Sequence, residues 1–228
     1  DSSSALHYSH DLLLKFETLW PGVELAKSEP PTSAKQLCIS SNIEPSLKWF
    51  MDSPEYRNWK DAYSPKLWLH GEHGDGKTVI MSYILKSLFR DTPHADKRDF
   101  ASIFCSNSDS EEGVVASIAF QLLQNKGRSR ALQTKFPILN IQSRNNGLLL
   151  WDLLTTLITA GPVTTFIIDG IDKLKPSVRS SFLDKFGGKA SITTIGVRVL
   201  ISSANDDDIQ RALSHYQSID RENERRGE

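Results

Sequence analysis

The feature that most constrains this sequence is a glycine-rich stretch, LWLHGEHGDGKTVIMSYIL, which begins at Leu67. It fits the pattern G-x-x-x-x-G-K-[ST] without a mismatch. The matching residues are Gly71, Gly76, Lys77 and Thr78. An apolar segment precedes the pattern and an amphipathic one follows it, in the strand–loop–helix order that a phosphate-binding loop requires. A chance match in a chain of this length has a probability of about 1%, so the stretch predicts a phosphate cradle rather than a turn that binds nothing.

Each part of this loop has a physical role in binding phosphate. Glycines permit a tight turn that directs backbone N–H groups inward, and the N-terminus of the following helix faces the same anion. Lys77 is expected to reach the β- and γ-phosphates, and Thr78 to place its hydroxyl on Mg²⁺. For His73, a solvent-facing position is favoured over a contact with phosphate. The predicted nucleotide-binding residues are Gly71, Glu72, His73, Gly74, Asp75, Gly76, Lys77, Thr78 and Val79.

An acidic pair follows a second apolar segment, TTFIIDGIDKL, at residues 164–174. Asp169 ends the expected strand, so its carboxylate lies at the carboxyl edge of the sheet, where the glycine-rich loop also lies. This placement predicts that Asp169 and Thr78 hold Mg²⁺, usually through a water in the case of the carboxylate. Asp172 is the candidate group that orients or deprotonates an attacking water, and capping of the next turn is the alternative. Asp172 and Asp169 are therefore the candidate catalytic residues.

Strand and helix patterns alternate along most of the chain. Apolar strand segments are expected at residues 66–71, 99–106, 163–170 and 195–204. Helices are expected at residues 77–89, 110–125, 147–158, 175–186 and 207–217. This alternation predicts an α/β fold, a three-layer P-loop domain in which a parallel sheet carries helices on both faces.

The sequence divides into three parts. Residues 1–42 hold a helical pattern at 8–20 and a Pro/Ser-rich linker, which predict an N-terminal helical appendage. Residues 43–216 form the P-loop nucleotide-binding domain, which starts with two short helices. Residues 217–228 are interpreted as the polar C-terminal tail of a truncated chain.

Composition and charge exclude several other classes of function. The formal net charge is -1, so no overall basic field predicts nucleic-acid binding. Cys38 and Cys105 are too few for a disulfide framework and lack the spacing of a metal site, so reduced thiols in an intracellular protein are expected. No apolar run approaches the ~20 residues of a membrane span, and the first residues do not form a signal peptide. We therefore predict a cytoplasmic protein.

Three smaller features receive structural interpretations. The run of three aspartates that begins at Asp206 is assigned to the N-cap and first turn of a helix rather than to a metal. The aromatic cluster within residues 49–59 is assigned to packing, with a contact to a nucleotide base as the alternative. Arg128, Arg130 and Arg179 are candidates for a finger that acts on a neighbouring molecule's phosphate, against a default of solvated helix faces.

Four stretches, taken in order, resemble one family. The first is WFMDSPEYRNW at residues 49–59, and the second is the glycine-rich stretch itself. The third is TTFIIDGIDKL at 164–174, and the fourth is RVLISSANDDDIQRAL at 198–213. Together they resemble the NACHT class of STAND NTPases within the wider AAA+-like P-loop group. The likeness covers about residues 43–216 and is closest to the nephrocystin-type N-terminal module of large fungal NOD-like receptors.

This resemblance implies a fold detail and a function. The strand that ends in Asp169, called Walker B in that family, is expected not to be the neighbour of the P-loop strand. The family binds ATP or GTP with Mg²⁺ and acts as a switch in innate immune signalling: closed with ADP or GDP, and self-associating when the triphosphate is bound. An effector domain upstream and repeats downstream are implied as well, and neither is present in this sequence.

The sequence departs from the family pattern at two positions. The Walker B block of the family usually reads Asp-x-x-Asp-Glu, but Lys173 follows Asp172 here. The sensor 1 strand usually ends in Ser-Ser-Arg or Thr-Ser-Arg, but Ala204 takes the place of the arginine. A guanidinium is a strong bidentate partner of phosphate, and alanine cannot replace it. Both departures favour slow hydrolysis, and they leave open a non-hydrolysing nucleotide-binding scaffold as the alternative.

Overall fold

The structure is a computed structural model. It describes Phe16 and residues 31–35, 43–63, 65–91, 99–135, 146–161, 163–187 and 196–221. Of the helix expected at 8–20, only Phe16 is described, and it is buried against Phe120. Cys38 lies outside the described residues, and Cys105 is a buried free thiol.

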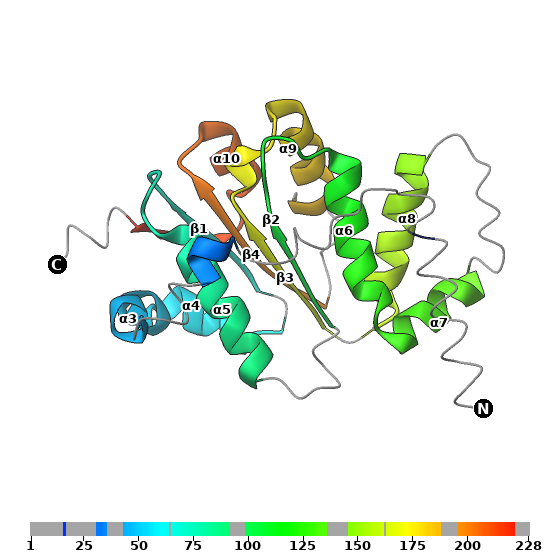
Figure 1. Ribbon diagram of the computed structural model, residues 1–228, viewed down its shortest axis with the longest axis horizontal. Helices are drawn as coiled ribbons and strands as arrows, with labels where there is room; N and C mark the ends of the chain where they lie inside the picture. Colours follow the sequence, from blue (N-terminus) through cyan, green and yellow to red (C-terminus); the bar gives the residue numbers. More distant parts are fainter. Residues whose placement is uncertain are drawn as a thin grey trace.

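Five strands form one sheet in which every paired strand runs parallel to its neighbour (Figure 1). The strands are β1 (Lys66–Gly71), β2 (Phe100–Phe104), β3 (Thr164–Asp169), β4 (Val197–Ala204) and β5 (Gln217–Asp220). Their order is β2-β3-β4-β1-β5, so β4 separates β1 from β3 as the resemblance implies. The parallel α/β fold predicted from the sequence is confirmed, and the carboxyl ends of all strands share one edge.

Helices cover both faces of this sheet and complete the three layers (Figure 1). On one face lie α3 (Glu44–Asp52), α4 (Pro54–Asp61) and α5 (Lys77–Asp91). On the other face lie α6 (Glu111–Leu123), α8 (Asn146–Thr159), α9 (Pro176–Phe182) and α10 (Asp207–Ala212), with α7 (Lys126–Lys135) packed on α8. A 3₁₀ turn, η3 (Ile171–Lys173), follows β3, and a π-helical turn, η4 (Leu183–Gly187), follows α9.

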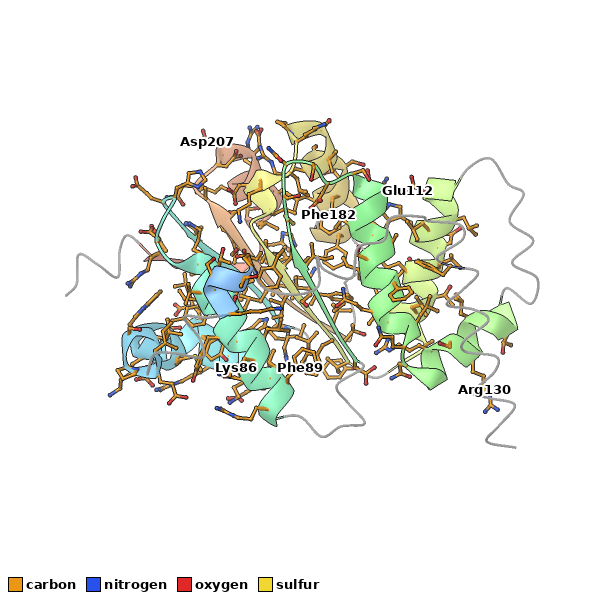
Figure 2. The ribbon with its side chains drawn as sticks, in the orientation of Figure 1. Lys86, Phe89, Glu112, Arg130, Phe182 and Asp207 are labelled. Atoms are coloured by element: carbon orange, nitrogen blue, oxygen red, sulfur yellow. The ribbon has the colours of Figure 1, made fainter. Side chains whose placement is uncertain are left out.

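Alternate residues of the strands supply two cores. In β1, Leu67 and Leu69 pack under α5, whereas Trp68 between them belongs to the core on the opposite face. The aromatic cluster of α3 and α4 packs as expected: the fully buried Trp59 donates its indole N–H to the carbonyl of Val199 over 2.8 Å. On the other face Phe182, labelled in Figure 2, stacks on Phe186. Burial on both faces accounts for the continuous apolar runs of β3 and β4.

Three elements differ from the sequence analysis. The helix expected at 207–217 ends at Ala212, and residues 217–220, assigned to a polar tail, form β5 beside β1. In this short edge strand only Ile219 is buried and apolar, so its pattern carries no strand signal. The helix α7 was not predicted because Arg128, buried and paired with Asp99, occupies much of its inward face.

Within the described residues, no helix has the length and apolarity needed to cross a bilayer.

Candidate functional site

The glycine-rich loop joins the carboxyl end of β1 to the first turn of α5. Gly71 ends the strand, and Lys77 begins the helix. The carbonyl oxygen of Gly76, just before the helix, accepts the backbone N–H groups of Val79 and Ile80. Gly76 has a φ of 78°, in the left-handed region that favours glycine. At Gly71, an added Cβ would lie 2.8 Å from a carboxylate oxygen of Asp75, so a larger residue would displace the loop.

Asp75 holds the loop together from within. Its side chain is buried, and its Oδ2 accepts the backbone N–H of Glu72 over 2.7 Å. This bond closes the turn across the residues that sequence analysis assigns to phosphate. Asp75 therefore shapes the loop, and its carboxylate faces the loop backbone.

Lys77 lies folded over the loop. Its Nζ donates to the carbonyl oxygens of Gly71 (2.9 Å) and Glu72 (2.6 Å). Burial lowers the pKa of Lys77, while the carboxylates of Asp75 and others nearby oppose that change. An ammonium held by two neutral carbonyls at the start of a helix is placed to exchange one of them for an anionic oxygen.

Thr78 and Asp169 meet across the edge of the sheet. The Thr78 hydroxyl donates to Asp169 Oδ2 over 2.7 Å, although 91 residues separate them in the sequence. Asp169 is only 1% exposed, and its other oxygen, Oδ1, accepts the Ser202 hydroxyl over 2.6 Å. Ser202 also accepts the backbone N–H of Gly170, so this serine of β4 fixes the direction of the carboxylate. This role of Ser202 was not predicted, because a serine inside a strand carries no signal of it.

Lys173 stands next to the same carboxylate. Its Nζ lies 3.8 Å from Asp169 Oδ2, the oxygen that also accepts Thr78. In the family pattern, a glutamate usually stands at the position of Lys173, and no binding role was predicted for the lysine. The structure adds its position, on the same side of the turn as the glycine-rich loop.

Asp172 is tied to the end of β4. Its Oδ1 accepts the backbone N–H of Ala204 over 2.9 Å, and its carbonyl oxygen accepts from Arg179 over 3.4 Å. Arg179 also pairs with Asp206 over 3.0 Å. Asp206 in turn caps α10 by accepting the N–H groups of Asp208 and Ile209, as expected from the sequence. A chain of bonds therefore links Asp172 to the first turn of α10.

These groups surround a cavity of about 290 Å³, which we call the loop pocket. Its lining includes residues 73–78 of the loop and both predicted aspartates, Asp169 and Asp172. It also includes three residues that sequence analysis does not assign: Gly170, Lys173 and Ser202. The other predicted residues, Gly71, Glu72 and Val79, are outside this lining.

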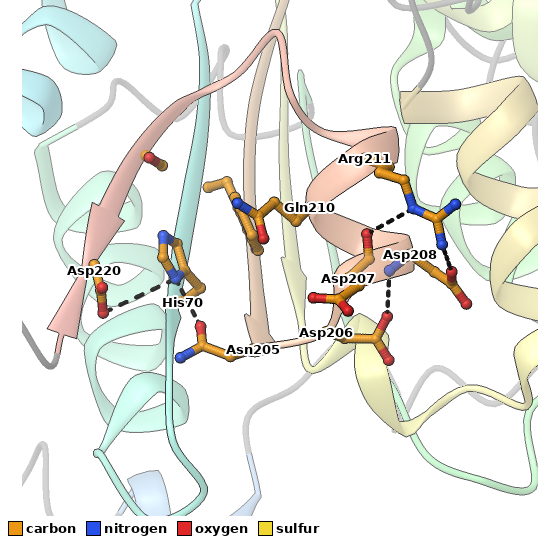
Figure 3. A pocket seen from close by; sticks show the side chains of 10 residues that line it. His70, Asn205, Asp206, Asp207, Asp208, Gln210, Arg211 and Asp220 are labelled. Atoms are coloured by element: carbon orange, nitrogen blue, oxygen red, sulfur yellow. Dashed lines mark hydrogen bonds and ion pairs between the residues drawn. The ribbon is translucent and has the colours of Figure 1, made fainter.

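A larger hollow of about 870 Å³ lies at the same edge of the sheet, between β1, β5 and α10 (Figure 3). We call it the acidic pocket, because four aspartates line it: Asp206, Asp207, Asp208 and Asp220. His70 forms part of its floor, stacks on Trp68 and shares a hydrogen bond with Asn205 over 2.8 Å. Arg211 also lines it and is paired with Asp208.

A comparison with known families places the chain. The family model described as Nephrocystin 3, N-terminal matches residues 45–204, which is more than half of the 228 residues. The chain belongs to this family. A search of curated proteins finds no match to it.

The part of the chain that matches the Nephrocystin 3 N-terminal family includes every residue that lines the loop pocket. It runs from α3 to the end of β4, and so it contains the glycine-rich loop, Asp169, Asp172 and Ser202. The acidic pocket is only partly inside it, since α10 and β5 follow residue 204. The family match therefore covers the loop pocket entirely.

Two of the three arginines that were candidates for a trans-acting role form hydrogen bonds within this Nephrocystin 3 N-terminal domain. Arg128 is fully buried and bonds Asp99 and the carbonyl of Leu157. Arg179 is buried in the network that joins Asp172 to Asp206. A trans-acting role would require either side chain to leave these contacts, whereas Arg130 is exposed. The default interpretation of Arg128 and Arg179 as side chains on solvated helix faces is wrong, because both are buried.

Proposed function

We propose that this chain binds ATP or GTP with Mg²⁺ in the loop pocket and hydrolyses it slowly, as a nucleotide-dependent switch of the NACHT class. The observation that carries the proposal is the meeting of Lys77, Thr78 and Asp169 at one helix N-terminus, with Thr78 and Asp169 2.7 Å apart. A lysine, a hydroxyl and a carboxylate in this arrangement are the groups that P-loop NTPases use for phosphates and metal.

The residues present suit Mg²⁺ as a ligand set. Mg²⁺ prefers oxygen ligands and keeps several waters, so one hydroxyl and one carboxylate are enough protein ligands. Thr78 and Asp169 are the residues that would hold it, with Ser202 fixing the carboxylate from behind. When bound, the ion would neutralise charge on the β- and γ-phosphate oxygens.

Asp172 is the group that we assign to the attacking water. One of its oxygens accepts the N–H of Ala204, and the residue lines the loop pocket. A carboxylate held in this way can orient a water and accept its proton. The end of β4 offers no guanidinium at this point, because residue 204 is alanine. This loss of a charged phosphate partner is the reason that we expect slow turnover.

The alternative is a non-hydrolysing scaffold in which the nucleotide is a structural cofactor. Lys173 beside Asp169 and Ala204 at the end of β4 favour it. In either case, we propose an intracellular signalling role of the NOD-like receptor type, in which triphosphate binding drives self-association and flanking effector and repeat domains provide output and trigger.

One experiment separates the two functions. The purified chain is denatured and any released nucleotide is identified by chromatography. Phosphate release from added ATP and GTP is then followed with Mg²⁺, for the wild type and for Asp172→Asn. Turnover that Asp172→Asn abolishes supports the slow NTPase. Bound nucleotide without turnover supports the scaffold, and the absence of both binding and turnover contradicts the proposed function.

A further inference from the structure

Lys173 has a position that hydrolysis does not explain. Its ammonium lies 3.8 Å from Asp169 Oδ2, and its side chain is 44% exposed while the carboxylate is almost fully buried. The same oxygen accepts the Thr78 hydroxyl, which marks the place where a metal ion would be held. Lys173 therefore brings a fixed positive charge to the mouth of the loop pocket, next to the predicted metal ligands.

The turn after β3 is shaped to accommodate this lysine. Gly170 has a φ of 70°, and a Cβ built on it would lie 2.9 Å from both Cε and Nζ of Lys173. Any larger residue at position 170 would push the lysine away from Asp169. The glycine thus permits two things at once: the left-handed turn and the return of the Lys173 side chain over it.

Two lysines from separate elements line the loop pocket. Lys77 comes from the start of α5 and Lys173 from η3, and both are part of the lining. The positive charge of Lys173 is close enough to be one of the influences that lower the pKa of Lys77, after burial, which is the largest. A polyphosphate bound in this pocket would have two ammonium groups within its lining to contact.

We propose that Lys173 is a second phosphate-binding lysine of this site and that it allows the chain to bind nucleotide without Mg²⁺. The inference rests on the proposed nucleotide binding and deepens it. An ammonium beside Asp169 can neutralise phosphate oxygens that would otherwise require the metal. The site then holds a nucleoside di- or triphosphate through two lysines and the loop backbone, with Mg²⁺ as an addition rather than a condition.

The test is the affinity for ATP, measured by calorimetric titration in Mg²⁺ and in EDTA. For the wild type, the dissociation constant should change by less than about threefold between the two buffers. In Lys173→Met the affinity in EDTA should fall about 10- to 100-fold, as expected for the loss of a charged hydrogen bond, with a much smaller loss in Mg²⁺. Lys173→Arg should restore binding in EDTA because it restores the charge.

Lys175→Met is the matched control, since Lys175 is an exposed lysine two residues away and outside the pocket lining. It should behave as the wild type in both buffers. Circular dichroism of each variant checks that it is folded. The inference is overturned if wild-type binding requires Mg²⁺, or if Lys173→Met lowers the affinity equally in both buffers. If no variant and no buffer gives ATP binding while Lys77 is intact, the proposed function itself is wrong.

Discussion

The loop pocket and the acidic pocket lie at the same edge of the sheet and differ in size and in the charges that line them. The acidic pocket is about three times larger, about 870 Å³ against about 290 Å³. Four aspartates and Arg211 line the larger hollow, whereas two lysines, three aspartates and the loop glycines line the smaller one. The larger hollow therefore has the greater excess of negative charge, and the smaller one has the glycine-rich loop and the N-terminus of α5, which favour an anion. Under the proposed function, volume alone would therefore select the wrong hollow for the phosphates.

Neighbouring residues of β4 serve the two hollows. Ser202 bonds Asp169 in the loop pocket, and Ser203, which points to the opposite face, accepts the indole N–H of Trp68 beside the acidic pocket. Alternation along one strand thus gives adjacent serines two different surroundings. Substitutions on either side of β4 should therefore affect the two hollows separately.

The largest effect is expected from Lys77→Ala. Under the proposed function, removing the ammonium assigned to phosphate should weaken ATP binding about 10- to 100-fold, the usual cost of a charged hydrogen bond. Calorimetric titration in Mg²⁺ measures the change. Lys86→Ala is the control, because Lys86 is an exposed lysine further along the same helix (Figure 2). Unchanged affinity in Lys77→Ala would contradict the proposal that the nucleotide binds in the loop pocket.

The next effect separates Ser202 from Ser203. Ser202→Ala leaves a buried carboxylate oxygen without its hydroxyl donor and should lower the free energy of unfolding by about 1–3 kcal/mol. Ser203→Ala removes a bond to a neutral indole and should cost about 1 kcal/mol. Urea unfolding gives both values. Only Ser202→Ala should also weaken ATP binding in Mg²⁺, so an equal loss of affinity in both variants would contradict the separation of the two hollows.

Local patterns and one topological rule were enough to predict that Thr78 and Asp169 lie together. Each residue ends or follows a strand pattern, and the carboxyl ends of parallel strands share an edge. The resemblance implied that another strand separates β1 from β3, but it did not give the register of β4, which brings Ser202 behind Asp169. The position of Lys173 was equally hidden, since it depends on the left-handed turn at Gly170.

The acidic pocket was harder to predict for a related reason. It requires β5, whose four residues include one buried apolar side chain, Ile219, and no alternation long enough to recognise. The role of Asp206 as a helix cap could be predicted because capping is local. Its pairing with Arg179 could not, because that arginine comes from a helix 27 residues earlier. Local roles were therefore predictable, and contacts between distant segments were not.

A smaller effect is expected from Asp206→Ala, on the acidic side. This change removes the cap of α10 and the partner of the buried Arg179, and should cost about 1–2 kcal/mol. For a chain of this size, the melting temperature should fall by about 2–8 °C. Asp207→Ala, an exposed first-turn residue, is the control and should lower it by no more than about 2 °C. Equal shifts in the two variants would mean that the cap and the Arg179 pair contribute nothing.

The smallest effect is expected from reversing a charge in the acidic pocket. Asp207→Lys changes the charge of an exposed side chain that lines the larger hollow and is absent from the loop pocket. At about 0.15 M salt, where exposed charges are screened beyond about 8 Å, ATP affinity should stay within about twofold of the wild type. Lower salt should let the added positive charge strengthen binding slightly. A large gain at 0.15 M salt would mean that phosphates bind in the acidic pocket, because only a direct contact survives that screening.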